Sequence, residues 1–361
     1  MEFGLAVATK IDDWQLIKYA EDLGYDRAWV PDSQMIWSDC YATLALAAQH
    51  TTRIRLGTGV AIPGGRLAPV TAHSIASINR LAPGRVFLGI GTGHTAMRVM
   101  GMPPMRVKDF RTYLQVVKTL LRGEEVEYTL NGVTRSIRFL HQDLGFLNLE
   151  TPIPMYVAAN GPLALQAAGA LGDGLISVGN EQPGVIQMHM GLVQTGAGKH
   201  DRQLPQTFHT AALTSAVVLK PGEPLTSERV INQTGAWAMA VVHFVYEIYL
   251  QTRREDMIPE ALRDIWEEYC TYVEHMETPA AQRYLQVHNG HCTFLMPEER
   301  RFVTPTVIQG TCLVGEPDAI LAQLRRVEAD GLKEVTLLPP MEHARVVLKE
   351  FAEQVIRKYE D

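Results

Sequence analysis

Three short apolar runs decide the fold class: residues 27–31 (RAWVP), 53–60 (RIRLGTGV) and 85–91 (RVFLGIG). Each run has the length and the aliphatic content of a buried strand, and each precedes a longer segment whose apolar residues recur at helical spacing. Residues 3–8 (FGLAVA) begin the same pattern. Strands that alternate with helices form a parallel sheet with helices outside it. The N-terminal part of the chain therefore predicts an α/β fold.

The alternation continues to the end of the chain. We expect strands at 3–8, 27–31, 53–60, 85–91, 155–158, 174–178, 210–219 and 334–338. We expect helices at 12–23, 41–49, 68–81, 105–122, 163–171, 185–194, 317–328 and 342–359. Eight parallel strands followed by helices are the number that closes a (β/α)8 TIM barrel.

Two segments interrupt this pattern. Residues 124–139 are polar around Asn131-Gly132, a pair that favours tight turns, so we expect a surface hairpin there. Residues from about 221 to 301 are rich in helix formers and aromatic residues. We expect them to form a helical insertion near the C-terminal face of the barrel rather than a separate domain. Residues 1–361 are then a single domain, because barrels of this kind often exceed about 250 residues.

Composition argues against several classes of protein. The 33 lysine and arginine residues face 40 acidic ones, a net charge of −7, and no basic run is present, so we expect no nucleic-acid partner. No apolar stretch has the length of a membrane span, and the first residues lack the pattern of a signal peptide. We therefore expect no membrane contact and a cytoplasmic location. The 4 cysteines form no CxxC pair, which favours free thiols.

Six motifs, taken in order, resemble the bacterial-luciferase-like family of flavin-dependent oxidoreductases, and within it the methylenetetrahydromethanopterin-reductase-like branch. They are WVPDSQ (29–34), RIRLGTGV (53–60), GRVFLGIGTG (84–93), YLQVVKTLLRGEE (113–125), YVAANGPLALQAAGALGDG (156–174) and GEP (315–317). The resemblance implies a TIM barrel whose active site lies at the C-terminal ends of the strands. It implies FMN as the cofactor, with the deazaflavin coenzyme F420 as the alternative.

Glycines at two predicted strand ends are candidates for binding the cofactor ring. The resemblance places a non-proline cis peptide bond at Gly59-Val60, behind the flavin ring; the alternative is a strand end whose glycines ease packing. Gly91 ends the fourth strand, where a missing side chain lets a planar ring approach the backbone. Its GxGxG spacing and its place in the fourth unit argue against a Rossmann fingerprint.

A phosphate site is expected where the fifth strand leads into a helix. Asn160, Gly161 and Pro162 put proline near the first helical position, so that free backbone N–H groups and the helix dipole face one point. In similar proteins the phosphate tail of the flavin binds here, with Val178 and Gly179 beside it. The alternative is an ordinary turn from strand to helix.

The candidate catalytic residues follow predicted strands or belong to the insertion. His94 can donate a hydrogen bond to the ring or the substrate, or hold a proton; many members of the branch carry an acidic residue here, and a surface-loop histidine is the alternative. Ser33 stands where deazaflavin enzymes often place the histidine of an Asp-His pair. Trp37 either walls a pocket or packs within its loop. His291, with Phe294, is a candidate for a substrate lid.

No metal is expected. His288 and His291 lie three residues apart, but the sequence shows no carboxylate or second pair that would complete a metal site.

We expect a flavin-dependent oxidoreductase, in first place a monooxygenase that uses reduced FMN and O2 on a small organic substrate. The alternative enzyme is an F420-dependent reductase or dehydrogenase that transfers a hydride directly. Alternatives from other classes are a flavin-binding protein without turnover and a metal-dependent barrel hydrolase. A flavin reductase that supplies reduced flavin is a candidate partner. Similar proteins often pair through barrel helices, so the resemblance also implies a homo-oligomer.

Overall fold

The protein is described by a computed structural model that covers residues 1–360. Eight parallel strands close into a barrel with the spatial order β1-β12-β9-β8-β7-β4-β3-β2. They are β1 (Glu2–Ala6), β2 (Arg27–Val30), β3 (Arg55–Ala61), β4 (Val86–Ile90), β7 (Met155–Ala158), β8 (Gly174–Val178), β9 (His209–Thr214) and β12 (Glu334–Leu337). The predicted (β/α)8 barrel is confirmed.

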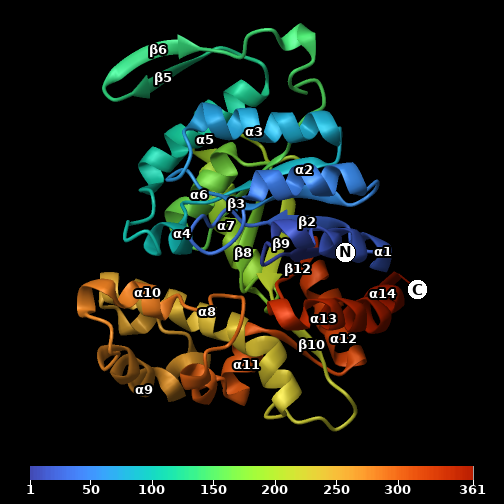
Figure 1. Ribbon diagram of the computed structural model, residues 1–361, viewed down its shortest axis with the longest axis vertical. Helices are drawn as coiled ribbons and strands as arrows, with labels where there is room; N and C mark the ends of the chain where they lie inside the picture. Colours follow the sequence, from blue (N-terminus) through green and yellow to red (C-terminus); the bar gives the residue numbers. More distant parts are fainter. Residues whose placement is uncertain (361) are drawn as a thin grey trace.

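Helices surround the barrel (Figure 1). They are α1 (Gln15–Leu23), α2 (Cys40–His50), α3 (Ala68–Leu81), α4 (His94–Arg98), α5 (Val107–Leu121), α6 (Pro162–Leu171), α7 (Val185–Gly198), α12 (Pro317–Ala329), α13 (Ala344–Phe351) and α14 (Arg357–Glu360), the last two joined by a π-helical turn (Ala352–Ile356). The eight predicted outer helices are confirmed to within a few residues. The sequence did not predict the short α4, which fills the loop after β4.

The predicted seventh strand, 210–219, is wrong in its second half. The barrel strand β9 ends at Thr214, whose backbone O still accepts a hydrogen bond from Leu338 N at 2.8 Å. One residue later, Ser215 O accepts from Leu313 N at 2.9 Å. The chain thus changes partner and continues as β10 (Ala216–Val218), which pairs with β11 (Leu313–Gly315) outside the barrel. Both halves are buried and apolar, so hydrophobicity alone could not reveal the break.

Two additions extend from the barrel (Figure 1). The predicted hairpin is confirmed as the antiparallel pair β5 (Val126–Leu130) and β6 (Val133–Ile137). The segment expected to be an insertion contains α8 (Glu228–Thr252), α9 (Arg263–Glu274) and α10 (Arg283–Val287), and α11 (Pro305–Thr311) follows it. Short 3-10 turns lie at Ile11–Asp13, Gln142–Leu144, Glu255–Met257, Glu260–Leu262, Ala280–Gln282, Pro297–Phe302 and Met341–His343. That the whole chain is one domain stays a prediction.

Among residues 1–360, no helix combines the length and the apolar character needed to cross a bilayer.

The barrel interior contains a buried charged cluster around Glu334 on β12. The Glu334 carboxylate contacts Trp29 Nε1 (2.7 Å), His209 Nε2 (2.6 Å), Thr336 Oγ1 (2.6 Å) and Arg27 Nε (3.0 Å). Burial alone would raise the pKa of Glu334, but the hydrogen bond and charge of His209, together with Arg27, hold that pKa below its ordinary value. The cluster therefore joins β2, β9 and β12 through one ionised carboxylate.

Replacing Glu334 by alanine is expected to lower the free energy of unfolding by about 3 kcal/mol, because the buried Arg27 would keep only the half-exposed Glu2 as its charge partner. Urea denaturation followed by far-UV circular dichroism measures the change. Asp256→Ala, which removes the exposed partner of Arg254, is the control and is expected to leave the unfolding curve unchanged. Equal stability of the two variants would contradict a role for the cluster in holding the barrel.

Candidate active site

The residues expected to bind a cofactor lie at the C-terminal ends of four strands that are neighbours in the barrel. Strands β3, β4, β7 and β8 lie side by side, and the carboxyl ends of parallel strands share one face of the barrel. Gly59 and Val60 lie near the end of β3, and Gly91 directly follows β4. Asn160 follows β7, and Gly179 follows β8. The structure therefore brings these candidates onto one arc of the barrel mouth.

Small residues cover the mouth between β3 and β7. The peptide bond between Gly59 and Val60 is cis, which confirms that prediction. A Cβ atom on Gly59 would lie 2.5 Å from that of Trp29, so this glycine also makes room for the tryptophan. A Cβ atom on Gly91 would lie 3.0 Å from Val60 Cγ2 and 3.1 Å from Ala158 Cβ. The missing side chain of Gly91 therefore lets three adjacent strands pack closely together at the mouth.

The N-terminus of α6 is open. The helix begins at Pro162, with Gly161 as an exposed N-cap of extended backbone. A Cβ atom on Gly161 would have no neighbour within 4 Å, and the same holds for Gly179. Asn160 Nδ2 donates a hydrogen bond to Val178 O at 2.9 Å, which joins the loops after β7 and β8. The first backbone N–H groups of α6 are accessible to an anion. That a phosphate binds there stays a prediction.

His94 begins α4 and faces helix α8. Its Nδ1 lies 3.3 Å from Oε2 of Glu247, and its ring packs edge-on against Phe244. The other oxygen of Glu247, Oε1, lies within hydrogen-bond distance of His288 Nε2 at 2.9 Å. Three buried polar atoms meet here without a hydrogen bond of good geometry among the described residues: His94 Nδ1, Arg98 Nε and Glu247 Oε2. Glu247 Oε2 also lies 3.5 Å from Arg98 Nε, so the carboxylate forms an ion pair with Arg98 beside the His94 ring.

Burial controls the protonation of this pair. It lowers the pKa of His94 to about 4, against the opposing effect of the Glu247 charge. Burial alone would raise the pKa of Glu247, but His288, with His94 and Arg98, holds that pKa below its ordinary value. At neutral pH the pair is a neutral imidazole beside a carboxylate. The side chain of His94 is 26% exposed, so it is not a free surface-loop histidine.

A cavity of about 660 Å³ opens beside these residues, within the usual size of small-molecule sites. Trp37, His291 and Phe294 all line it, as expected of pocket residues. Trp37 Nε1 donates a hydrogen bond to Thr293 Oγ1 at 3.0 Å, and its ring centroid lies 6.1 Å from that of His291. Ser33 is not among the lining residues; its backbone O accepts from Trp37 N at 3.0 Å. Its place in the site is one of loop support.

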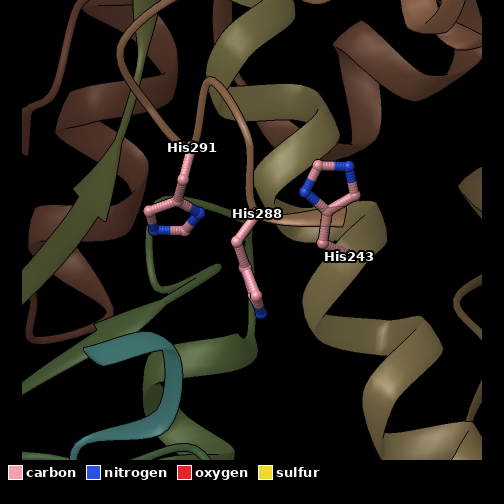
Figure 2. Close-up of side chains that lie close together, drawn as sticks. All are labelled: His243, His288 and His291. Carbon is pink, nitrogen blue, oxygen red and sulfur yellow. The ribbon is translucent and has the colours of Figure 1, made fainter. Parts of the chain in front are cut away.

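His243 on α8 joins the two histidines that the sequence had singled out. Figure 2 shows His243, His288 and His291 close together, and one ring nitrogen of each lies within 4.8 Å of the others. Nε2 of His243 lies 2.8 Å from Glu299 Oε1. No sequence pattern linked His243 to this pair. His243 and Glu247 are four residues apart, which puts two polar groups on one face of an apolar helix. This spacing is the signal in the sequence that could have identified His243 as a site residue.

The chain belongs to the luciferase-like family of oxidoreductases. A family model described as luciferase-like monooxygenase matches residues 12–334. The resemblance predicted from the six motifs is therefore confirmed.

Curated relatives share a part of the chain. A 5,10-methylenetetrahydromethanopterin reductase of Methanolobus tindarius is 33% identical over 199 residues, which cover 54% of this chain and 58% of the relative. An F420-dependent glucose-6-phosphate dehydrogenase of Beutenbergia cavernae is 35% identical over 199 residues, which cover 51% and 58%. The matched part thus spans less than two thirds of each of these relatives.

Solved structures share the fold over the whole chain. A coenzyme F420-dependent tetrahydromethanopterin reductase from Methanopyrus kandleri has a TM-score of 0.68 at 20% identity and covers 99% of both chains. The oxygenating constituent of 3,6-diketocamphane monooxygenase from Pseudomonas putida, in complex with FMN, has a TM-score of 0.60 at 16% identity and covers 99% of this chain and 98% of its own.

His94 is expected to titrate near pH 4 in the folded chain, and Glu247→Gln to lower its pKa further, because the neutral amide no longer favours the imidazolium. NMR of the chain with isotopically labelled histidine measures the titration, and His94→Gln assigns the resonance. A His94 resonance that titrates near pH 6.5 in both proteins would contradict the assigned burial.

Proposed function

We propose that this chain is an oxidoreductase that uses coenzyme F420 to transfer a hydride to or from a small organic substrate. The observation that carries the proposal is the 35% identity with an F420-dependent glucose-6-phosphate dehydrogenase. The 33% identity with a methylenetetrahydromethanopterin reductase supports a reductase or dehydrogenase in preference to a monooxygenase. The sequence expectation of FMN and O2 becomes the second candidate.

The residues at the mouth fit a flavin-like group. Val60 and Ala158 are partly exposed on strands adjacent to Gly91, and the missing side chain of Gly91 keeps bulk away from this part of the mouth. Gly161 and Gly179 leave open space at the N-terminus of α6, where backbone N–H groups and the helix dipole favour a phosphate. We assign the ring to the first group of residues and the phosphate end to the second.

The protein groups near the ring site supply positioning and proton control. Bound F420 would supply a hydride carrier whose ring lacks the nitrogen that supports oxygen chemistry. His94 is neutral at pH 7, so it serves as a hydrogen-bonding group rather than as a stored proton. Glu247 fixes the orientation of His94 and His288 from helix α8. Trp37 and Phe294 line the cavity.

The cavity favours a substrate with both an apolar part and polar atoms. Half of its lining residues are apolar, including Trp37 and Val99, while Lys10, His288 and His291 supply polar or charged groups. A small alcohol, carbonyl or similar organic compound fits this lining. The homo-oligomer and the partner flavin reductase stay predictions, and the reductase belongs only to the FMN alternative.

The choice between F420 and FMN is tested by binding and oxygen uptake. The purified chain is expected to bind F420 more tightly than FMN, measured by quenching of cofactor fluorescence. Under the proposal, reduced FMN supports no oxygen uptake above the protein-free rate with a panel of alcohols and ketones, and F420 turnover depends on substrate. Tighter FMN binding with substrate-dependent oxygen uptake would establish the monooxygenase. Binding of either cofactor without turnover across the panel would favour a binding protein.

Gly161→Val is expected to weaken cofactor affinity about tenfold or more, because it removes space for the phosphate and its charge-assisted hydrogen bonds to the backbone. The φ of Gly161 is −85°, so valine can adopt this backbone. Gly198→Val, at the end of α7 and also in open space, is the matched control. Fluorescence titration of both variants measures the effect. Equal cofactor affinities of the two variants would contradict binding of the phosphate end at α6.

A further inference from the structure

We propose that His243, His288 and His291 bind one divalent metal ion of the zinc class. The proposal replaces the expectation that the chain binds no metal, and it is independent of which redox cofactor the barrel uses. Its basis is a cluster of three imidazoles whose free nitrogens are buried without partners.

The three side chains converge from two elements. His243 lies on α8, while His288 and His291 lie in the turn that follows α10. One nitrogen of each ring lies within 4.8 Å of the others, and Figure 2 shows nitrogens of His243 and His291 facing one another with His288 close by. Three nitrogens on a tetrahedral zinc ion are about 3.4 Å apart, given Zn–N distances of about 2.0–2.1 Å. A small adjustment of the turn closes this difference.

Hydrogen bonding leaves the same nitrogen free in each ring. Nδ1 of His243, His288 and His291 is buried and has no hydrogen-bond partner among the described residues. Nε2 of His243 contacts Glu299 at 2.8 Å, and Nε2 of His288 contacts Glu247 at 2.9 Å. A carboxylate on the outer nitrogen places the proton there and leaves the Nδ1 lone pair for a cation. Metal-binding histidines are usually held in this way.

The charges around the cluster suit a divalent cation. Glu247 and Glu299 are buried carboxylates directly behind two of the rings. Arg98 offsets part of the Glu247 charge, while His243 is the ion-pair partner of Glu299 among the described residues, so Glu299 supplies the main negative charge for the ion. Three protein ligands leave one coordination position open, as in catalytic zinc sites. His288 and His291 also line the 660 Å³ cavity, so the open position is accessible to water or to an oxygen atom of a ligand there.

A second cluster of potential ligands, Glu2, His209 and Glu334, carries no such proposal. Its Glu334 carboxylate is already engaged by Trp29 and Arg27, so a cation would have to displace a buried guanidinium.

The test uses the full chain without an affinity tag. After treatment with a chelator, the protein receives one equivalent of Zn2+, free metal is removed, and bound zinc is measured by mass spectrometry. We expect one zinc per chain, a visible spectrum of tetrahedral Co2+ when cobalt replaces zinc, and a rise in the thermal midpoint on adding metal. His243→Ala, His288→Ala and His291→Ala are expected to lose the bound metal. Glu299→Gln is expected to weaken binding about 10- to 100-fold.

His275→Ala, at the exposed end of α9, is the control and is expected to bind one zinc as the unmodified chain does. Circular dichroism establishes that each variant is folded. If the His243→Ala variant unfolds, the test relies on His291→Ala and His291→Gln, because His291 is only partly buried and lies in a turn. A chain that retains no zinc, or folded His291 variants that retain it with unchanged affinity, would overturn the proposal.

Discussion

The carboxylate of Glu334 has no access to water, so its charge has to be balanced from within the barrel, and β2 and β9 supply the partners. Trp29 connects this buried cluster to the mouth of the barrel. The indole of Trp29 donates to Glu334, the Cβ atom of the same residue faces Gly59, and Gly59 is bonded directly to Val60 at the proposed ring site. Gly4 completes the arrangement, because a Cβ atom there would collide with the Glu334 carboxylate. Trp29 thus contacts both the buried charge and the strand that carries the proposed ring site.

The barrel itself could be predicted because its pattern is local. Each strand is a short apolar run and each helix an amphipathic segment, so their alternation was visible without knowledge of their partners. The errors fall where partner choice matters. Thr214 and Ser215 belong to one apolar run, yet their carbonyl groups bond to strands from different sheets. The short helix that begins at His94 was missed, because it is stabilised by contacts with α8 rather than by its own five residues.

The site was predictable to the extent that it belongs to the barrel. Strand order places Gly59, Gly91 and Gly161 on one arc, and the structure has them there. The groups from the insertion were not predictable, because Glu247 and His243 meet His94 and His288 only through tertiary packing. The positions of Glu247 and His243 in the sequence do not indicate which barrel loop these residues face. The loop residues of the site could therefore be predicted from the sequence, but the contacts that helix α8 makes with them could not.

The hydrogen bond between Trp37 and Thr293 joins residues 256 positions apart. Thr293 O also accepts a hydrogen bond from Met341 N, so one residue holds loops from the first and the last parts of the barrel. During synthesis the N-terminal strands leave the ribosome long before Thr293 is made, and until then the loop that carries Trp37 has no partner there. The cavity is therefore among the last parts of the molecule to be completed, and a nascent chain lacks it until nearly all of its residues have been translated.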